Sequence, residues 1–120
     1  MFQGLRTVIY PARNLAAAKA WYTQALGQAP YFDQPFYAGF NVGGYELGLD
    51  PNAPAAGQSG VVAYWGVPDA HAAYARLLEL GASSHDLVRD VGQGILVGVV
   101  QDPFGNLLGV IQNPYFQLPA

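Results

Sequence analysis

The sequence predicts an α+β fold made of two copies of one strand–helix–strand–strand unit. One observation is that the candidate helix N-caps, Asn14 and Asp69, stand 55 residues apart. A second is that two strand patterns have the same shape, a glycine-containing turn followed by an apolar strand: Val42–Leu49 (VGGYELGL) and Asp102–Ile111 (DPFGNLLGVI). Because neither unit buries its sheet face alone, we expect the two to pack as a pair.

The first unit begins with a β-branched and aromatic run and continues into an alanine-rich helix. Asn14 is placed to cap this helix, and Gly27 stands where a left-handed C-terminal glycine belongs. The pair Gly43-Gly44 is typical of a tight turn between two strands. The predicted elements are a strand over Leu5–Tyr10, a helix over Leu15–Leu26, a loop over Gln28–Pro35 and strands over Phe36–Val42 and Tyr45–Asp50.

The second unit repeats this order after a segment rich in Pro, Gly, Ala and Ser. Asp69 caps its helix, and Gly81 ends it, 54 residues after Gly27. The predicted elements are a strand over Val61–Val67, a helix from Asp69 to about Leu80, strands over Leu87–Val91, Ile95–Gln101 and Leu107–Gln112, and an irregular tail over Asn113–Ala120. We therefore expect a single domain over 1–120, with one module at about 4–52, a linker at about 51–60 and a second module at about 61–112.

The composition argues against several classes of function. Apolar residues make up 52% of the chain and charged residues 11%, below the roughly 25% charged residues of an average globular chain. The net charge is −3 and there is no basic run, so we expect neither nucleic-acid binding nor attachment to a membrane. The absence of cysteine excludes disulfides and cysteine-bound zinc. No signal peptide or membrane-spanning run is recognisable, so we expect a cytoplasmic location.

In their order and spacing, these motifs resemble the vicinal oxygen chelate superfamily. That group includes glyoxalase I, extradiol dioxygenases, fosfomycin-resistance proteins and bleomycin-resistance binding proteins. The resemblance extends from Leu5 to Gln112 and rests on the helix ending AWYTQALG, the GGYELGL hairpin, the second helix ending LLELG, and DPFGNLLGVI, which is close to the family's usual DPDGN. It implies two βαβββ modules that form a curved mixed sheet, with the helices on the convex side and a cup on the concave side. It also implies a homodimer.

The resemblance bears directly on metal binding. The family's metal enzymes usually place a His on the first strand of each module and a Glu on the last. The matching positions here hold Thr7, Gly48, Val62 and Gly109. Val and Gly supply no donor atoms, whereas such a site needs three or four converging ligands. We therefore expect no cofactor, and a divalent metal only at a displaced site built from Glu46, Asp50 and a histidine.

Strand alternation, counted from these four positions, predicts which side chains line the cup. The lining is mostly apolar, with three glycines and a few polar groups, as is usual for a small-molecule site. The predicted ligand-binding residues are Thr7, Ile9, Glu46, Gly48, Asp50, Val62, Tyr64, Gly66, Leu107, Gly109 and Ile111. Glu46 is the candidate general acid or base, because an unpaired carboxyl in an apolar cup gains affinity for a proton. The alternative is that Glu46 is an exposed hairpin residue.

Other polar and aromatic side chains have competing interpretations. His71 and His85 are expected in solvent, since neither lies on a predicted cup strand. Arg6 and Arg89 are expected to pair with a carboxylate at a rim or dimer interface, or to bind an anion. The aromatic segment Tyr31–Tyr37 (YFDQPFY) is placed either to cap the cup or to pack in a dimer.

Three hypotheses for function follow. We prefer the first, that the protein binds a small, partly apolar molecule without the usual His/Glu metal site, by bleomycin-resistance-type sequestration or by metal-independent chemistry. The second is a metal-dependent lyase, isomerase or dioxygenase with a displaced metal site. The third is an interaction module whose cup is filled by its own or a partner's side chains.

Overall fold

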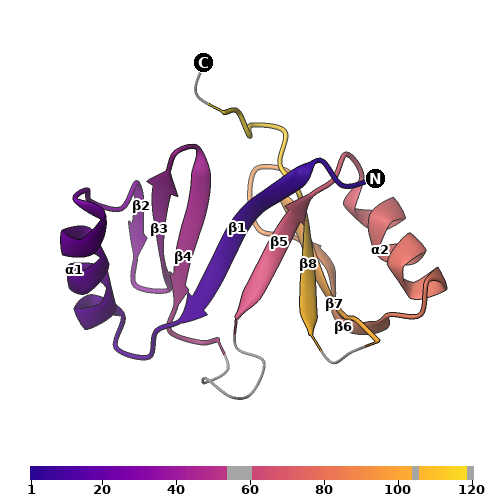
Figure 1. Ribbon diagram of the computed structural model, residues 1–120, viewed down its shortest axis with the longest axis horizontal. Helices are drawn as coiled ribbons and strands as arrows, with labels where there is room; N and C mark the ends of the chain where they lie inside the picture. Colours follow the sequence, from indigo (N-terminus) through magenta and orange to yellow (C-terminus); the bar gives the residue numbers. More distant parts are fainter. Residues whose placement is uncertain (54–60, 104–105, 119–120) are drawn as a thin grey trace. The chain divides into compact units, whose positions relative to one another are not determined.

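The computed structural model of the chain describes residues 1–53, 61–103 and 106–118 (Figure 1). Two compact units are present. The α1 unit consists mainly of Thr7–Val61, and the α2 unit of Met1–Arg6 together with Val62–Gln117. Residues 54–60 of the predicted linker and residues 104–105 of the DPFGN turn lie outside the described residues.

In the α1 unit, one helix packs on one face of a mixed sheet (Figure 1). Strand β1 (Gly4–Pro11) enters this unit with residues 7–11, and the sheet order is β2-β3-β4-β1. Strands β1 and β4 are parallel, and the other neighbours are antiparallel. The remaining elements are α1 (Leu15–Leu26), β2 (Phe32–Gln34), β3 (Tyr37–Val42) and β4 (Tyr45–Asp50).

The α2 unit has the same topology. Strands β5 and β8 form the parallel pair, β7 and β6 extend the sheet antiparallel, and residues 4–6 of β1 belong to this unit. The elements are β5 (Val62–Gly66), α2 (Ala70–Glu79), β6 (Ser83–Asp90), β7 (Leu96–Gln101) and β8 (Leu107–Gln112). The structure confirms the predicted α+β fold of two βαβββ modules.

The helix ends form as the sequence predicts. Asn14 Oδ1 accepts a hydrogen bond from the Ala17 N–H at 3.1 Å, and Asp69 Oδ1 accepts one from the Ala72 N–H at 3.0 Å. Each cap satisfies a backbone donor that the first helical turn leaves without a partner. Gly27 adopts the left-handed conformation, with φ 71°, that ends α1. No helix among the described residues is long and apolar enough to span a membrane.

Each helix covers an apolar cluster on its own sheet. The α1 cluster contains the fully buried Phe40 and Leu49, against which the inward side of α1 packs. The α2 cluster contains Tyr74, Val100 and Val110. The hydroxyl of Tyr74 has two hydrogen-bond partners: it lies 2.6 Å from Ser84 Oγ and donates to the Val99 carbonyl at 3.2 Å.

Two strands differ from those predicted from the sequence. Strand β2 lies inside the predicted loop Gln28–Pro35, and β6 begins at Ser83 rather than at Leu87. Both are the outermost strands of their sheets, and their side chains are almost all exposed. An exposed edge strand shows no alternation of apolar and polar residues, and it tolerates nearby prolines. Strand β5 is also one residue shorter at each end than predicted.

Candidate functional site

Each unit has a sheet face that its helix does not cover, which we call the open face. In the α1 unit, register pairs Thr7 with Glu46 and Ile9 with Gly48 across β1 and β4. Leu49, next to Gly48 in sequence, packs against α1. Alternation therefore brings these four predicted lining residues together on the open face of the α1 unit.

Four further predicted residues meet on the open face of the α2 unit. Register pairs Tyr64 with Gly109 and Gly66 with Ile111 across β5 and β8. Val110, between Gly109 and Ile111, lies in the apolar cluster under α2. The predicted alternation therefore describes both units.

The three remaining predicted residues stand at strand ends. Val62 and Leu107 are the first residues of β5 and β8, and both are half-buried. Asp50, the last residue of β4, accepts a hydrogen bond from the Asn52 N–H at 2.8 Å and so shapes the turn after the strand.

Glycines of the open faces lie under planar side chains from neighbouring parts of the same unit. At Gly109, an added Cβ would stand 2.5 Å from Cδ1 of Tyr64. This is closer than real Cβ contacts, so the ring occupies the space that a side chain would need. The other pairs of this kind are Tyr37 over Gly48 and Arg6 over Gly66; at Gly39 an added Cβ would stand 3.1 Å from Glu46 Oε1 and 3.3 Å from Cε1 of Tyr31.

On the open face of the α1 unit, a carboxylate lies between two tyrosine hydroxyls. Tyr37 donates to Glu46 Oε2 at 2.6 Å, and Tyr31 donates to Glu46 Oε1. Burial of its hydroxyl end raises the pKa of Tyr31, and the hydrogen bond to Glu46 and the charge of Glu46 raise it further. We call these three residues the Glu46 cluster. Both of its carboxylate oxygens accept hydrogen bonds from within the unit, and Glu46 itself is half-buried.

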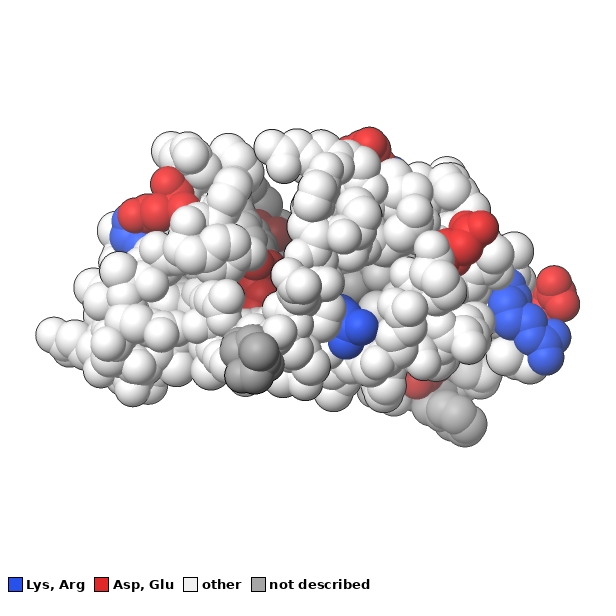
Figure 2. Space-filling view, turned by 90° about the horizontal axis from the view of Figure 1, so that it is seen from above, with Lys and Arg blue, Asp and Glu red and all other residues white. Residues whose placement is uncertain are grey.

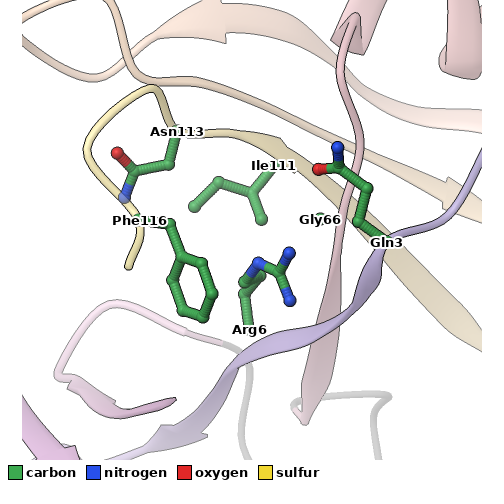
Figure 3. A pocket seen from close by; sticks show the side chains of 6 residues that line it. All are labelled: Gln3, Arg6, Gly66, Ile111, Asn113 and Phe116. Atoms are coloured by element: carbon green, nitrogen blue, oxygen red, sulfur yellow. The ribbon is translucent and has the colours of Figure 1, made fainter. Parts of the chain in front are cut away.

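On the open face of the α2 unit lies a cavity of about 340 Å³ (Figure 3). Figure 3 shows the Arg6 guanidinium between the ring of Phe116 and Gly66. Its Cζ stands 3.8 Å from the ring centroid, and its Nη1 donates to the Leu5 carbonyl at 3.2 Å. We call this cavity the Arg6 pocket; its lining residues are Gln3, Arg6, Gly66, Ile111, Asn113 and Phe116.

The charge of Arg6 has no carboxylate partner among the described residues. The ion pairs found there join Lys19 to Asp33 at 2.8 Å and Arg76 to Glu79 at 3.3 Å. Charged side chains are sparse on the face shown in Figure 2. A half-buried guanidinium without a counter-ion in the described part of the chain is therefore a distinctive feature of this protein.

Sequence reasoning placed two residues of the Arg6 pocket, Gly66 and Ile111, and missed the others. Arg6 was not among the predicted lining residues; it was expected only to pair with a carboxylate or to bind an anion. Asn113 and Phe116 follow the last strand, in the tail that was expected to be irregular. An arginine in a chain with few charges was the one available signal.

The positions matched to metal ligands do not fit a His/Glu centre. Gly48 lies under the Tyr37 ring, with an added Cβ 2.6 Å from Cζ, and Gly109 lies under Tyr64. A glutamate at either position would displace an aromatic side chain that is already in place. Among the described residues, no group of three or more His, Cys, Asp or Glu side chains is arranged to hold a metal ion.

Comparison with known proteins gives a family and a fold. The chain matches the model of the Glyoxalase/Bleomycin resistance protein/Dioxygenase superfamily over residues 4–110. No curated protein matches the chain.

The solved structures similar to this chain include a glyoxalase/bleomycin resistance protein/dioxygenase superfamily member from Vibrio splendidus 12B01. It is 21% identical, covers 90% of this chain and 97% of its own, and superposes with a TM-score of 0.69. A variant of Streptomyces coelicolor methylmalonyl-CoA epimerase in complex with 2-nitronate-propionyl-CoA is 15% identical, covers 99% and 100%, and has a TM-score of 0.77. At these identities, the likeness concerns the fold.

Proposed function

The chain belongs to the glyoxalase/bleomycin resistance protein/dioxygenase superfamily, and from this premise we propose that it binds a small, partly apolar organic molecule without a metal ion. The observation that carries the proposal is the Arg6 pocket. It combines apolar side chains, Ile111 and Phe116, with the polar groups of Gln3, Arg6 and Asn113. The lining is more polar than apolar, and placed polar groups of this kind fix the orientation of a ligand in a small-molecule site.

The size of the pocket limits the ligand. Its volume of about 340 Å³ is near the lower end of the roughly 300–1,000 Å³ found for small-molecule pockets. A single-ring compound or a short aliphatic chain matches this volume, and a large antibiotic does not.

Binding without metal is supported by the covered glycines. Tyr37 and Tyr64 lie over Gly48 and Gly109, the positions at which the family's metal enzymes carry glutamates. The chain has therefore placed aromatic surface where those enzymes place metal ligands. The alternative of a displaced metal site has no comparable support, because both carboxylate oxygens of Glu46 accept hydrogen bonds from tyrosine hydroxyls.

A fragment screen on metal-stripped protein tests the proposal. We expect single-ring and short-chain fragments to shift the NMR signals of Ile111 and Phe116, and the same shifts to appear with EDTA present. Added Ni²⁺, Zn²⁺ or Mn²⁺ should change neither the shifts nor the melting temperature. Fragment binding that appears only with one of these metals would favour the displaced-site alternative. The absence of any fragment binding would overturn the proposal.

We also propose that the protein forms a homodimer. Large apolar side chains are exposed on its surface, with Trp21 62% and Leu87 74% exposed. Exposed apolar surface of this kind is common at sites of protein association. Light scattering at several concentrations tests this, and a mass equal to that of the single chain throughout would contradict it.

A further inference from the structure

We propose that the Arg6 pocket selects organic monocarboxylates, with Arg6 binding the carboxylate and the apolar side chains holding the body of the molecule. This inference rests on the proposed function, since it names the class of molecule bound at the same site. It depends on three observations: how the guanidinium is held, which of its donors stay available, and what lies around it.

The guanidinium is held in place by packing. The Phe116 ring lies 3.8 Å from Cζ, and on the Gly66 side an added Cβ would stand 2.6 Å from Nε. Any residue other than glycine at position 66 would therefore displace the group. Stacking an arginine in this way fixes its orientation before a ligand arrives, so less side-chain entropy is lost on binding.

Stacking occupies the faces of the guanidinium and leaves its edges to donate. A guanidinium carries five N–H donors in its plane. Among the described residues, Nη1 of Arg6 donates to the Leu5 carbonyl at 3.2 Å. The remaining donors suit a carboxylate, whose two oxygens match the spacing of two parallel N–H groups.

The surroundings favour an anion with an apolar body. Apart from Arg6, the lining residues carry no charge, so nothing in the pocket neutralises the guanidinium. The side-chain amides of Gln3 and Asn113 add donors, and Ile111 and Phe116 supply apolar surface (Figure 3). A bare inorganic anion would leave that apolar surface in water, whereas an aryl or alkyl carboxylate covers it.

Matched pairs of acid and neutral amide test this inference. We would measure the binding of benzoate and benzamide, and of hexanoate and hexanamide, by NMR titration at pH 7.5. We expect each acid to bind at least about tenfold more tightly than its amide, because hydrogen bonds to charged groups are the stronger ones. Acetate should bind more weakly than hexanoate, since it lacks the apolar body.

Variants separate the role of Arg6 from general effects of charge. Arg6→Gln should remove the preference for the acid, so that each acid and its amide bind this variant with similar affinity. Arg6→Lys should restore only part of it, because an ammonium lacks the planar fork. Arg89→Gln is the matched control: Arg89 lies on β6, outside the pocket lining, so this variant should bind like the wild type. Amide NMR spectra would verify that each variant is folded.

The possible results distinguish this inference from the proposed function. Equal binding of acids and amides, with shifts at Ile111, would overturn the carboxylate inference and leave small-molecule binding standing. An acid preference that survives Arg6→Gln would also overturn it. The absence of binding by any of these probes, together with an empty fragment screen, would overturn both.

Discussion

The two open faces share a design and differ in how their central charge is satisfied. Each presents a charged group next to a glycine that lies under a planar side chain. In the α1 unit, Glu46 accepts hydrogen bonds from two tyrosine hydroxyls. In the α2 unit, Arg6 stacks on Phe116 and donates to one backbone carbonyl. The carboxylate is satisfied by the protein, whereas the guanidinium keeps donors for a ligand.

This difference shows that two units with the same topology can have different roles. Both units use the same strand order, and in both a side-chain oxygen, of Asn14 or Asp69, caps the helix N-terminus, so these features of the scaffold do not distinguish them. What distinguishes them is the charged side chain of each open face and its partners: Glu46 with two tyrosine hydroxyls in one, Arg6 over Gly66 in the other. A tyrosine hydroxyl that donates to a carboxylate satisfies that carboxylate within the protein. A stacked guanidinium keeps the N–H donors in its plane available to another group.

The largest stability effect is expected at the covered glycines. Gly109→Ala would place a methyl group 2.5 Å from the Tyr64 ring, and overpacking of this kind costs about 1–3 kcal/mol. Urea unfolding measures the loss. The double variant Gly109→Ala/Tyr64→Ala should be less destabilised than the sum of the single variants, because the clash is removed. Additive losses would show that the ring does not fill this space.

The second-largest loss of stability is expected when the carboxylate of the Glu46 cluster is removed. Glu46→Leu removes the hydrogen bonds that Tyr31 and Tyr37 donate to this carboxylate, which should lower the free energy of unfolding by about 1–2 kcal/mol. Glu79→Gln is the matched control, because Glu79 forms an exposed pair with Arg76 and should change stability by less than about 0.5 kcal/mol. Equal effects of the two variants would contradict a structural role for the cluster.

The helix caps should show no difference between the units. Asn14→Ala and Asp69→Ala each remove one acceptor from a helix N-terminus, so each should cost about 1 kcal/mol. Thermal unfolding monitored by circular dichroism measures both. A loss at one cap several times larger than at the other would show that the two scaffolds are not equivalent.

The smallest effect concerns pH. The pKa of Tyr31 is raised in the folded protein above the value of about 10 for a free tyrosine. Folding therefore favours the protonated phenol, and this contribution is present below about pH 10 and is lost as the pH rises further. Unfolding free energies between pH 8 and 11 should fall less steeply for Tyr31→Phe than for the wild type. Identical slopes would contradict the raised pKa.

The sequence sufficed for the scaffold and for part of the site. The cap-to-cap interval and the glycine turns predicted both helices and the interior strands, because buried elements impose periodicity on their residues. The alternation that placed Glu46 and Gly66 on open faces has the same origin. The sequence did not predict β2 or the start of β6, because exposed edge strands impose no such pattern on their residues.

The rest of the site depends on packing that alternation does not encode. The contact between Tyr37 and Gly48 depends on how a side chain folds over the neighbouring strand. The contact between Phe116 and Arg6 depends on the path of the tail after β8. From the sequence, a glycine on an open face predicts room above the sheet. The structure shows which neighbouring side chain fills that room.

If Arg6 serves a ligand while Glu46 serves the fold, urea unfolding of Arg6→Gln and Glu46→Gln with and without benzoate will separate the two roles. At about ten times its dissociation constant, benzoate should stabilise the wild type by about 1.4 kcal/mol. We predict that Glu46→Gln lowers the starting stability and keeps this increment. Arg6→Gln should change the starting stability less and lose the increment. The claim would be contradicted by an increment that persists in Arg6→Gln and disappears in Glu46→Gln.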